Sequence, residues 1–149
     1  RDDNGNIAGN EFFGVAAQAK YADLAEIYKS ENGDIPVGTI VAITGGPGDT
    51  EIGPAQLMGV DPIGIISDAP AYLMNSEAAG QAVGLVGRVP MLVKGHAKMG
   101  STVYLCDDEP GIGTTEPDIN QPLKRVGYVL EEDAGDSDTA RLIECFIKC

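Results

Sequence analysis

Acid–base catalysis in this 149-residue sequence would depend on a single histidine, and the residues around it favour a turn. His96 lies in the segment Lys94-Gly95-His96-Ala97-Lys98, which is basic and contains a glycine. A Ser-His-Asp triad needs a carboxylate that orients the imidazole, and this segment supplies none. We therefore expect His96 to be a surface turn residue, and we predict no catalytic residues.

Three cysteines could form disulfides or bind metal. No cysteine lies at zinc-finger spacing from His96, so a zinc site is not expected. On a terminal strand, Cys145 and Cys149 would share a face about 13 Å apart, at roughly 3.3 Å per residue, which is too far for a disulfide. We expect small buried apolar side chains at these positions, while a disulfide from Cys106 to Cys145 or Cys149 stays open.

A group of acidic residues surrounds a loop rich in glycine and proline and could bind a hard cation such as calcium or magnesium. Their order matches no calcium-binding loop, so we predict no metal site, although cation binding stays open. Catalysis of glycoside hydrolysis by two of them would need a carboxylate separation that the sequence does not define. The group consists of Asp107, Asp108, Glu109, Glu116 and Asp118.

Composition excludes several further classes of function. Residues 44–53 are rich in glycine but lack the Lys-Ser or Lys-Thr of a phosphate-binding loop, and we expect no cofactor. With 23 acidic and 10 basic residues and a net charge of −13, the chain has no cationic patch for nucleic acid. No apolar run approaches the length of a membrane span, and residues 1–4 have no signal-peptide character, so we expect synthesis in a reducing cytoplasm and no membrane insertion.

The elements that would position these residues are mostly short strands separated by glycine and proline. We predict a mainly β fold, an antiparallel sandwich or barrel in residues 34–149, preceded by an extended leader and one short helix in residues 1–33. Within the longest strand, Pro90 indicates a bend or an edge, because proline cannot donate to a β-ladder. The expected strands are residues 39–44, 63–67, 81–94, 102–106, 125–130 and 140–147.

The predicted helix covers residues 16–28. Its apolar residues Tyr21, Leu24, Ala25 and Tyr28 follow the i, i+3, i+4, i+7 spacing of an amphipathic helix. The segment Asn32-Gly33 would end it.

Short fragments along nearly the whole chain carry a resemblance to a known family. They are residues 21–26, 35–41, 64–67, 70–75, 87–90 and 100–104. In this order they resemble the C-terminal module of bacteriophage tail-fibre and virion structural proteins, especially those of cyanophages. The resemblance implies a non-catalytic homotrimer in the virion that contacts other phage structural proteins. Attachment to a host surface receptor stays open, and if the module binds one, we expect the loops around Pro47, Met74 and Ile112 to make the contact.

The leader supplies a physical reason for trimerisation. Phe12 and Phe13 lie in a segment with few core residues, so neighbouring chains would have to bury them. We predict trimer or packing contacts at Phe12, Phe13, Tyr21, Leu24 and Tyr28.

Asp23 and Glu26 are similar to the start of a self-cleaving intramolecular chaperone found at the end of phage appendage proteins. In that family a serine-aspartate bond is cut with help from the following glutamate. Ala22 replaces the serine here, which removes the hydroxyl needed for acyl transfer. The simpler interpretation is a pair of adjacent, solvated carboxylates at i and i+3 of the helix.

The β part is also similar to small capsid decoration proteins, which stabilise the phage head as trimers. In that alternative, residues 1–15 would form the extended arm that clamps neighbouring capsid subunits. We therefore expect an assembly protein of a phage particle, with the self-cleaving chaperone as the enzymatic alternative.

Overall fold

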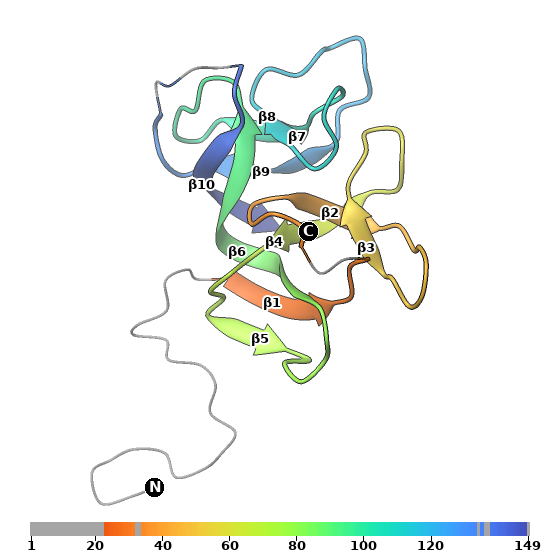
Figure 1. Ribbon diagram of the computed structural model, residues 1–149. Helices are drawn as coiled ribbons and strands as arrows, with labels where there is room; N and C mark the ends of the chain where they lie inside the picture. Colours follow the sequence, from red (N-terminus) through yellow and green to blue (C-terminus); the bar gives the residue numbers. More distant parts are fainter. Residues whose placement is uncertain (1–22, 32–33, 134, 136–137, 149) are drawn as a thin grey trace, which may run out of the picture.

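The computed structural model describes residues 23–31, 34–133, 135 and 138–148, and every regular element within them is a β-strand (Figure 1). These residues contain no helix with the length and apolar character needed to cross a membrane. The strands are β1 (Asp23–Tyr28), β2 (Ile40–Ile43), β3 (Ile52–Pro54), β4 (Pro62–Ile66), β5 (Tyr72–Met74), β6 (Gln81–Lys94), β7 (Thr102–Leu105), β8 (Gly113–Thr114), β9 (Arg125–Val129) and β10 (Arg141–Lys148).

Five strands close into a barrel in the order β6-β8-β7-β9-β10, because β10 pairs with both β9 and β6. The β6–β8 pair is parallel, and the other four pairs are antiparallel. Only the C-terminal part of β6 belongs to this ring. Residues 81–85 continue beyond the barrel, while Val86 and Gly87 pair with both β1 and β10.

The N-terminal part of β6 lies in a second, open sheet, which has the order β5-β1-β6-β4-β2-β3. Here β1 runs antiparallel to β6 and parallel to β5. The strand β6 therefore joins the two parts of the molecule, with the barrel above and β1 and β5 below in Figure 1.

The prediction of a mainly β fold is confirmed, but the predicted short helix is wrong, and the sheet expected to be antiparallel has mixed strand orientation. Residues 23–28 form β1 instead of the C-terminal part of a helix, while residues 16–22 lie outside the described part. Ladders to β6 on one side and β5 on the other hold β1 extended, so tertiary pairing overrides the helical spacing of Leu24, Ala25 and Tyr28. The parallel pairs β1–β5 and β6–β8 make the sheet mixed.

The six strands expected from apolar patterns are present with small shifts at their ends, and residues 81–94 match β6. Pro90 lies opposite Glu144 of β10, and among the described strands no other partner flanks residues 88–92. The Glu144 backbone amide donates to Glu131 Oε1, and its carbonyl accepts from Leu130 N, both just after β9. Because neither group of Glu144 bonds to β6, the missing amide of Pro90 costs the ladder no hydrogen bond. The expected local edge at this proline is confirmed.

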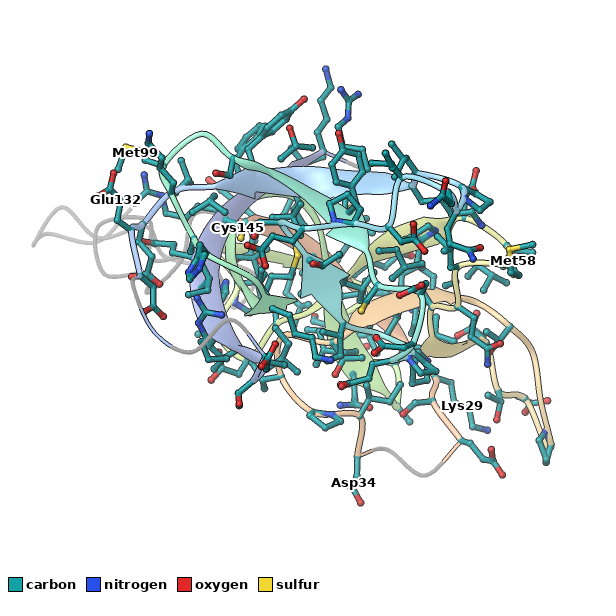
Figure 2. All side chains as sticks on the ribbon, turned by 90° about the horizontal axis from the view of Figure 1, so that it is seen from above. Lys29, Asp34, Met58, Met99, Glu132 and Cys145 are labelled. Carbon is teal, nitrogen blue, oxygen red and sulfur yellow. The ribbon has the colours of Figure 1, made fainter. Side chains whose placement is uncertain are left out.

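Two clusters of buried side chains lie on opposite faces of the strands. The larger cluster fills the barrel with aliphatic residues, including Val89, Met91 and Ile143, and Cys145 lies inside it (Figure 2). The smaller cluster contains Val41, Ile52, Ile66 and Val83 and packs against the outer side of the open sheet. Strand β2 serves both clusters, because alternate residues on a strand point to opposite faces.

Candidate functional site

Asp23, the first residue of β1, is the described site residue with the most unusual surroundings. Its side chain is only 1% exposed. It pairs with Gly87 of β6, which in turn pairs with the buried Ile147 of β10. Asp23 and Ala25 therefore point to the same side of the sheet as the barrel core, whereas Leu24 points outward.

A glycine makes room for this carboxyl group. A Cβ atom on Gly84 would lie 2.8 Å from Asp23 Oδ2, so a side chain there would displace the carboxylate. Close packing of the next strand adds to the constraint, since a Cβ on Gly64 of β4 would lie 2.2 Å from the Gly84 carbonyl oxygen. The carboxyl of Asp23 thus lies in a small space that exists because Gly84 has no side chain and because β4 and β6 approach closely at Gly64 and Gly84.

Within the described residues, neither carboxylate oxygen of Asp23 nor the hydroxyl of Ser67 has a hydrogen-bond partner of good geometry. Burial raises the pKa of Asp23, the negative charge of Asp68 adds to the increase, and the nearby hydroxyl of Ser67 opposes it in part. The backbone carbonyl of Asp23 accepts a hydrogen bond from Ala71 N at 3.0 Å, which ties the segment before β5 to β1. Compared with water, the site shifts the protonation equilibrium of Asp23 toward the neutral carboxylic acid.

Glu26 lies on the opposite face of β1 from Asp23, so the expected pair of adjacent carboxylates is not formed. The physical reason is the strand: residues three apart adjoin on a helix but point to opposite faces when extended. Tyr28, two residues further, donates its hydroxyl to Glu26 Oε2 at 2.9 Å. Burial and this hydrogen bond to a carboxylate both raise the pKa of Tyr28.

The other residues proposed for trimer contacts fall in different places. Phe12, Phe13 and Tyr21 lie outside the described residues. Tyr28 packs against the smaller core cluster, and Leu24 is exposed on the outer side of the open sheet. Their part in trimer contacts stays a prediction.

The acidic loop contains the one group of candidate metal ligands found among the described residues. Cys106 Sγ and carboxylate oxygens of Asp107 and Asp108 lie within 4.8 Å of one another. Lys94 already supplies a cation, since its Nζ lies 2.6 Å from Glu109 Oε1 and 3.8 Å from Asp108 Oδ2. The hydrogen bond to Glu109 raises the pKa of Lys94 and so keeps the ammonium charged.

The thiol of Cys106 is also unsuited to metal binding. It donates a hydrogen bond to Asp108 Oδ1 at 2.8 Å, and burial raises its pKa, so the thiol form is favoured over the thiolate that metals bind. The arrangement fits an internal ion pair better than a metal centre.

Cys106 and Cys145 are both buried as free thiols, and Cys149 lies outside the described residues. A Cys106–Cys145 disulfide is therefore not formed. Burial raises the pKa of the Cys145 thiol to about 12. Cys145 acts as a small apolar side chain in the barrel core, as expected, whereas the buried Cys106 also donates a hydrogen bond to Asp108.

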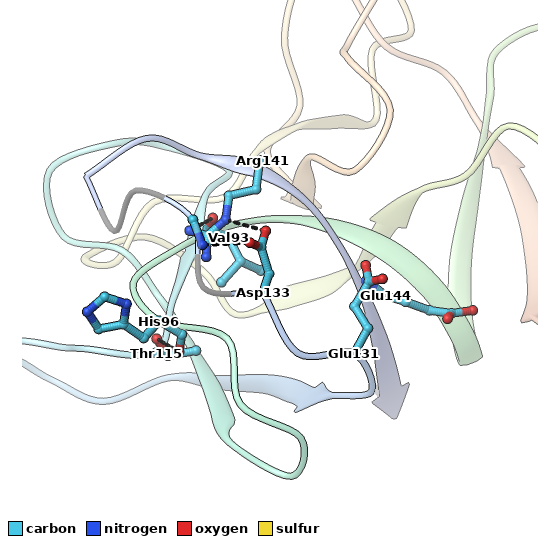
Figure 3. A network of polar contacts seen from close by, with 8 residues as sticks. Val93, His96, Thr115, Glu131, Asp133, Arg141 and Glu144 are labelled. Atoms are coloured by element: carbon cyan, nitrogen blue, oxygen red, sulfur yellow. Dashed lines mark hydrogen bonds and ion pairs between the residues drawn. The ribbon is translucent and has the colours of Figure 1, made fainter.

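His96 is exposed just after β6, as expected of a turn residue, and its backbone carbonyl accepts a hydrogen bond from Thr115 Oγ1 at 2.9 Å (Figure 3). In the same region, Arg141 Nε donates to Asp133 Oδ2 at 2.9 Å and Nη1 donates to the Val93 carbonyl at 3.3 Å. These contacts tie the acidic segment after β9 to the ends of β6 and β10. The network stabilises this end of the barrel.

Sequence reasoning missed Ser67, Gly84 and the burial of Asp23. The glycine has no signal of its own within an apolar strand, because its importance depends on which side chain a distant strand places beside it. Asp23 was assigned to a solvated helix face, where a carboxylate has no special environment.

Comparisons of the sequence with profiles of known protein families and with curated proteins find no match. The fold is similar to that of the pre-mature gene product 12 of bacteriophage phi29, with a TM-score of 0.59 and 15% sequence identity over 86% of this chain. The aligned part is 22% of the phi29 chain, so this chain spans about a fifth of that protein.

The fold is also similar to a C-terminal fragment of the same phi29 protein. Here the TM-score is 0.55 and the identity 15%, and the alignment covers 85% of this chain and 100% of the fragment. At this identity the likeness shows a shared fold. The cyanophage character inferred from the sequence fragments stays a prediction.

Proposed function

We propose that this chain is a structural module of a bacteriophage particle, located at the C-terminal end of an appendage or tail-fibre protein and acting in assembly as a homotrimer. The observation that carries the proposal is the shared fold with the whole C-terminal fragment of phi29 gene product 12. The short sequence fragments that resemble phage fibre modules agree with this proposal.

The chemistry of the described residues favours assembly over catalysis. The pocket beside Lys94 is lined by carboxylates and contains neither histidine nor serine among its described lining residues. Its thiol, Cys106, is held in the unreactive form. By contrast, the open sheet presents exposed apolar side chains, which suit contacts between protein chains.

Two experiments test the proposal. Sedimentation equilibrium of the chain should give the mass of a trimer, and a monomer at all concentrations would contradict the assembly role. Quantitative mass spectrometry of purified particles should count a few copies or tens of copies, as expected for a fibre. Hundreds of copies per particle would instead identify a capsid decoration protein.

Host attachment is a finer part of the proposal, and inhibition of phage adsorption by the purified chain would support it.

A self-cleaving module is the second candidate, because the buried, unpartnered Asp23 carboxyl lies directly after the bond that would be cut. The side chain of Glu26 on the opposite face and the missing hydroxyl at Ala22 weigh against it. Incubation of a longer chain decides between the candidates: a released fragment beginning at Asp23, abolished by Glu26→Gln, would establish cleavage. Such a fragment would also be present in the lysate and absent from mature particles.

A further inference from the structure

A row of exposed apolar side chains crosses the open sheet. Leu24 of β1 pairs with Tyr72 of β5 on one side and Val86 of β6 on the other. Residues directly opposite each other in neighbouring strands share a face, so these three side chains lie next to one another. Their exposed fractions are 39% for Leu24, 59% for Tyr72 and 41% for Val86.

A second row continues the same surface around the outside of the barrel. Phe146 of β10 pairs with Arg88 of β6 and with Tyr128 of β9. Arg88 is two residues from Val86 on β6, so both rows point to the same side of the sheet. Phe146 and Tyr128 are 39% and 36% exposed. We call the surface formed by Tyr72, Leu24, Val86, Phe146 and Tyr128 the outer face.

Basic residues accompany the outer face, although the chain as a whole carries a net charge of −13. Arg88 pairs with Phe146 across the strands, Lys148 pairs with Val86, and the Arg125 guanidinium carbon lies 5.7 Å from the centre of the Tyr128 ring. The positive charge of Arg88 is partly neutralised by Glu144, whose Oε1 lies 3.4 Å from Arg88 Nη1. An apolar surface with a basic fringe is complementary to an acidic protein surface that also offers apolar contacts.

The protein that best matches this description is another copy of the same chain. Its own surface is strongly acidic, and it exposes further apolar side chains, including Met58 and Ile119. We propose that the outer face docks against a neighbouring copy of this chain. The inference rests on the proposed function, since it names the surface that the homotrimer would use.

The path of the chain supports a second copy as the partner of the outer face. Asp23 begins β1 next to Leu24 on the outer face, so whatever precedes β1 reaches the module beside this surface. In a fibre whose three chains run together before the module, this geometry holds the outer face of each copy close to its neighbouring copies. Tethering raises the effective concentration of such surfaces to about the millimolar range, which favours contact between copies.

Charged substitutions on the outer face test the inference with the full 149-residue chain. Tyr72→Glu and Phe146→Glu place carboxylates at half-exposed positions and should raise the concentration at which the trimer dissociates by at least about tenfold, as expected for aromatic contacts in an interface. Ile43→Glu is the matched control, because Ile43 is 48% exposed on β2, which β4 separates from β6 in the order of the sheet. The control should dissociate like the wild type. Circular dichroism and thermal unfolding should show that all three variants fold.

A second measurement does not depend on the stability of the variants. A photoreactive phenylalanine analogue in place of Tyr72 should crosslink one copy to another, whereas the same group in place of Ile43 should not. A wild-type trimer that is unchanged by both outer-face substitutions, with no crosslink from position 72, would overturn the inference and leave the proposed function standing. A wild type that stays monomeric at all concentrations would overturn both.

Discussion

The closed barrel and the open sheet share β6 but differ in how their strands end. In the barrel each strand pairs with a neighbour on both sides, and among the described strands β6 has a local edge only at residues 88–92. In the open sheet, β5 pairs only with β1 among the described strands, and the outer side of β3 has only an isolated bridge from Ile52 to Ser30. Unpaired edges and exposed faces are where proteins add further chains. The barrel is therefore the stable body, and the open sheet is the part suited to assembly.

The two parts also differ in what they bury. The barrel core is aliphatic, with Ile143 and Cys145 almost completely inaccessible to solvent. The open sheet buries the carboxyl of Asp23 while leaving Leu24 and Tyr72 exposed. A buried polar group and exposed apolar groups both lower the stability of an isolated chain. We expect local opening of the molecule to begin in the open sheet.

The largest expected effect is the loss of an aliphatic side chain inside the barrel. Ile143→Ala should lower the free energy of unfolding by about 2–5 kcal/mol, because the closed ring cannot collapse around the cavity. Urea unfolding followed by circular dichroism measures it. The control is Leu142→Ala on the same strand, where the side chain is 49% exposed and a smaller change is expected. Equal losses in the two variants would contradict a close-packed barrel interior.

The next effect tests the close approach of β4 and β6. Gly64→Ala should cost about 1–3 kcal/mol, because the new Cβ would meet the Gly84 backbone. Native-state hydrogen exchange should show faster exchange in β1, β4 and the first part of β6, while β7 and β9 keep their protection. Gly59→Ala in a loop is the control. Uniform loss of protection across both parts would show that they open as one unit.

A smaller effect concerns the proton on Asp23. The folded state raises the pKa of Asp23 above its unfolded value of 3.8, so the folded protein binds this proton more tightly. The resulting stability is complete below the unfolded pKa and is lost as pH rises through the folded pKa. At neutral pH, Asp23→Asn should therefore increase the free energy of unfolding, on the order of 1 kcal/mol.

The pH profile separates this explanation from a simple packing change. The difference between Asp23→Asn and wild type should shrink toward zero near about pH 3, where Asp23 is protonated in both states. Asp68→Asn, which removes the nearby negative charge, should have the same sign and a smaller size. A gain from Asp23→Asn that is constant with pH would argue against a charged group as the cause.

The smallest effect is expected at an ion pair on the outside of the barrel. Arg88 and Glu144 join β6 and β10 at 3.4 Å, with 50% and 31% of their side chains exposed. Arg88→Ala should change the free energy of unfolding by about 0.5 kcal/mol or less, since solvent and salt screen such pairs. A loss comparable to that of Ile143→Ala would mean that the barrel wall depends on surface charge.

Much of the barrel could be predicted from the sequence, because its strands show the apolar patterns of strands with a buried face. Residues 81–94 are the clearest example, since alternating aliphatic residues and Pro90 predicted both the strand and its local edge. The short strands β3, β5 and β8 could not be found this way. Strands of two or three residues carry no periodic pattern and exist only because a longer neighbour pairs with them.

The error at residues 23–28 has a different physical origin. Leu24, Ala25 and Tyr28 have helical spacing, and an acidic residue at position 23 was taken as solvated. In the structure Asp23 and Ala25 point inward, so the true alternation includes a buried carboxylate. No single-sequence pattern reveals that Gly84, far along the chain, leaves space for it. The pairing of β1 with two distant strands likewise depends on long-range register.

The closure of the barrel by β10 has a consequence for the timing of synthesis. Strands β6 and β9 both pair with β10 (Arg141–Lys148). The ring therefore cannot close until β10 has left the ribosome. Until then, the aliphatic interior of β6, β7 and β9 is open to water and to other nascent chains. Premature termination before β10 should therefore yield insoluble product.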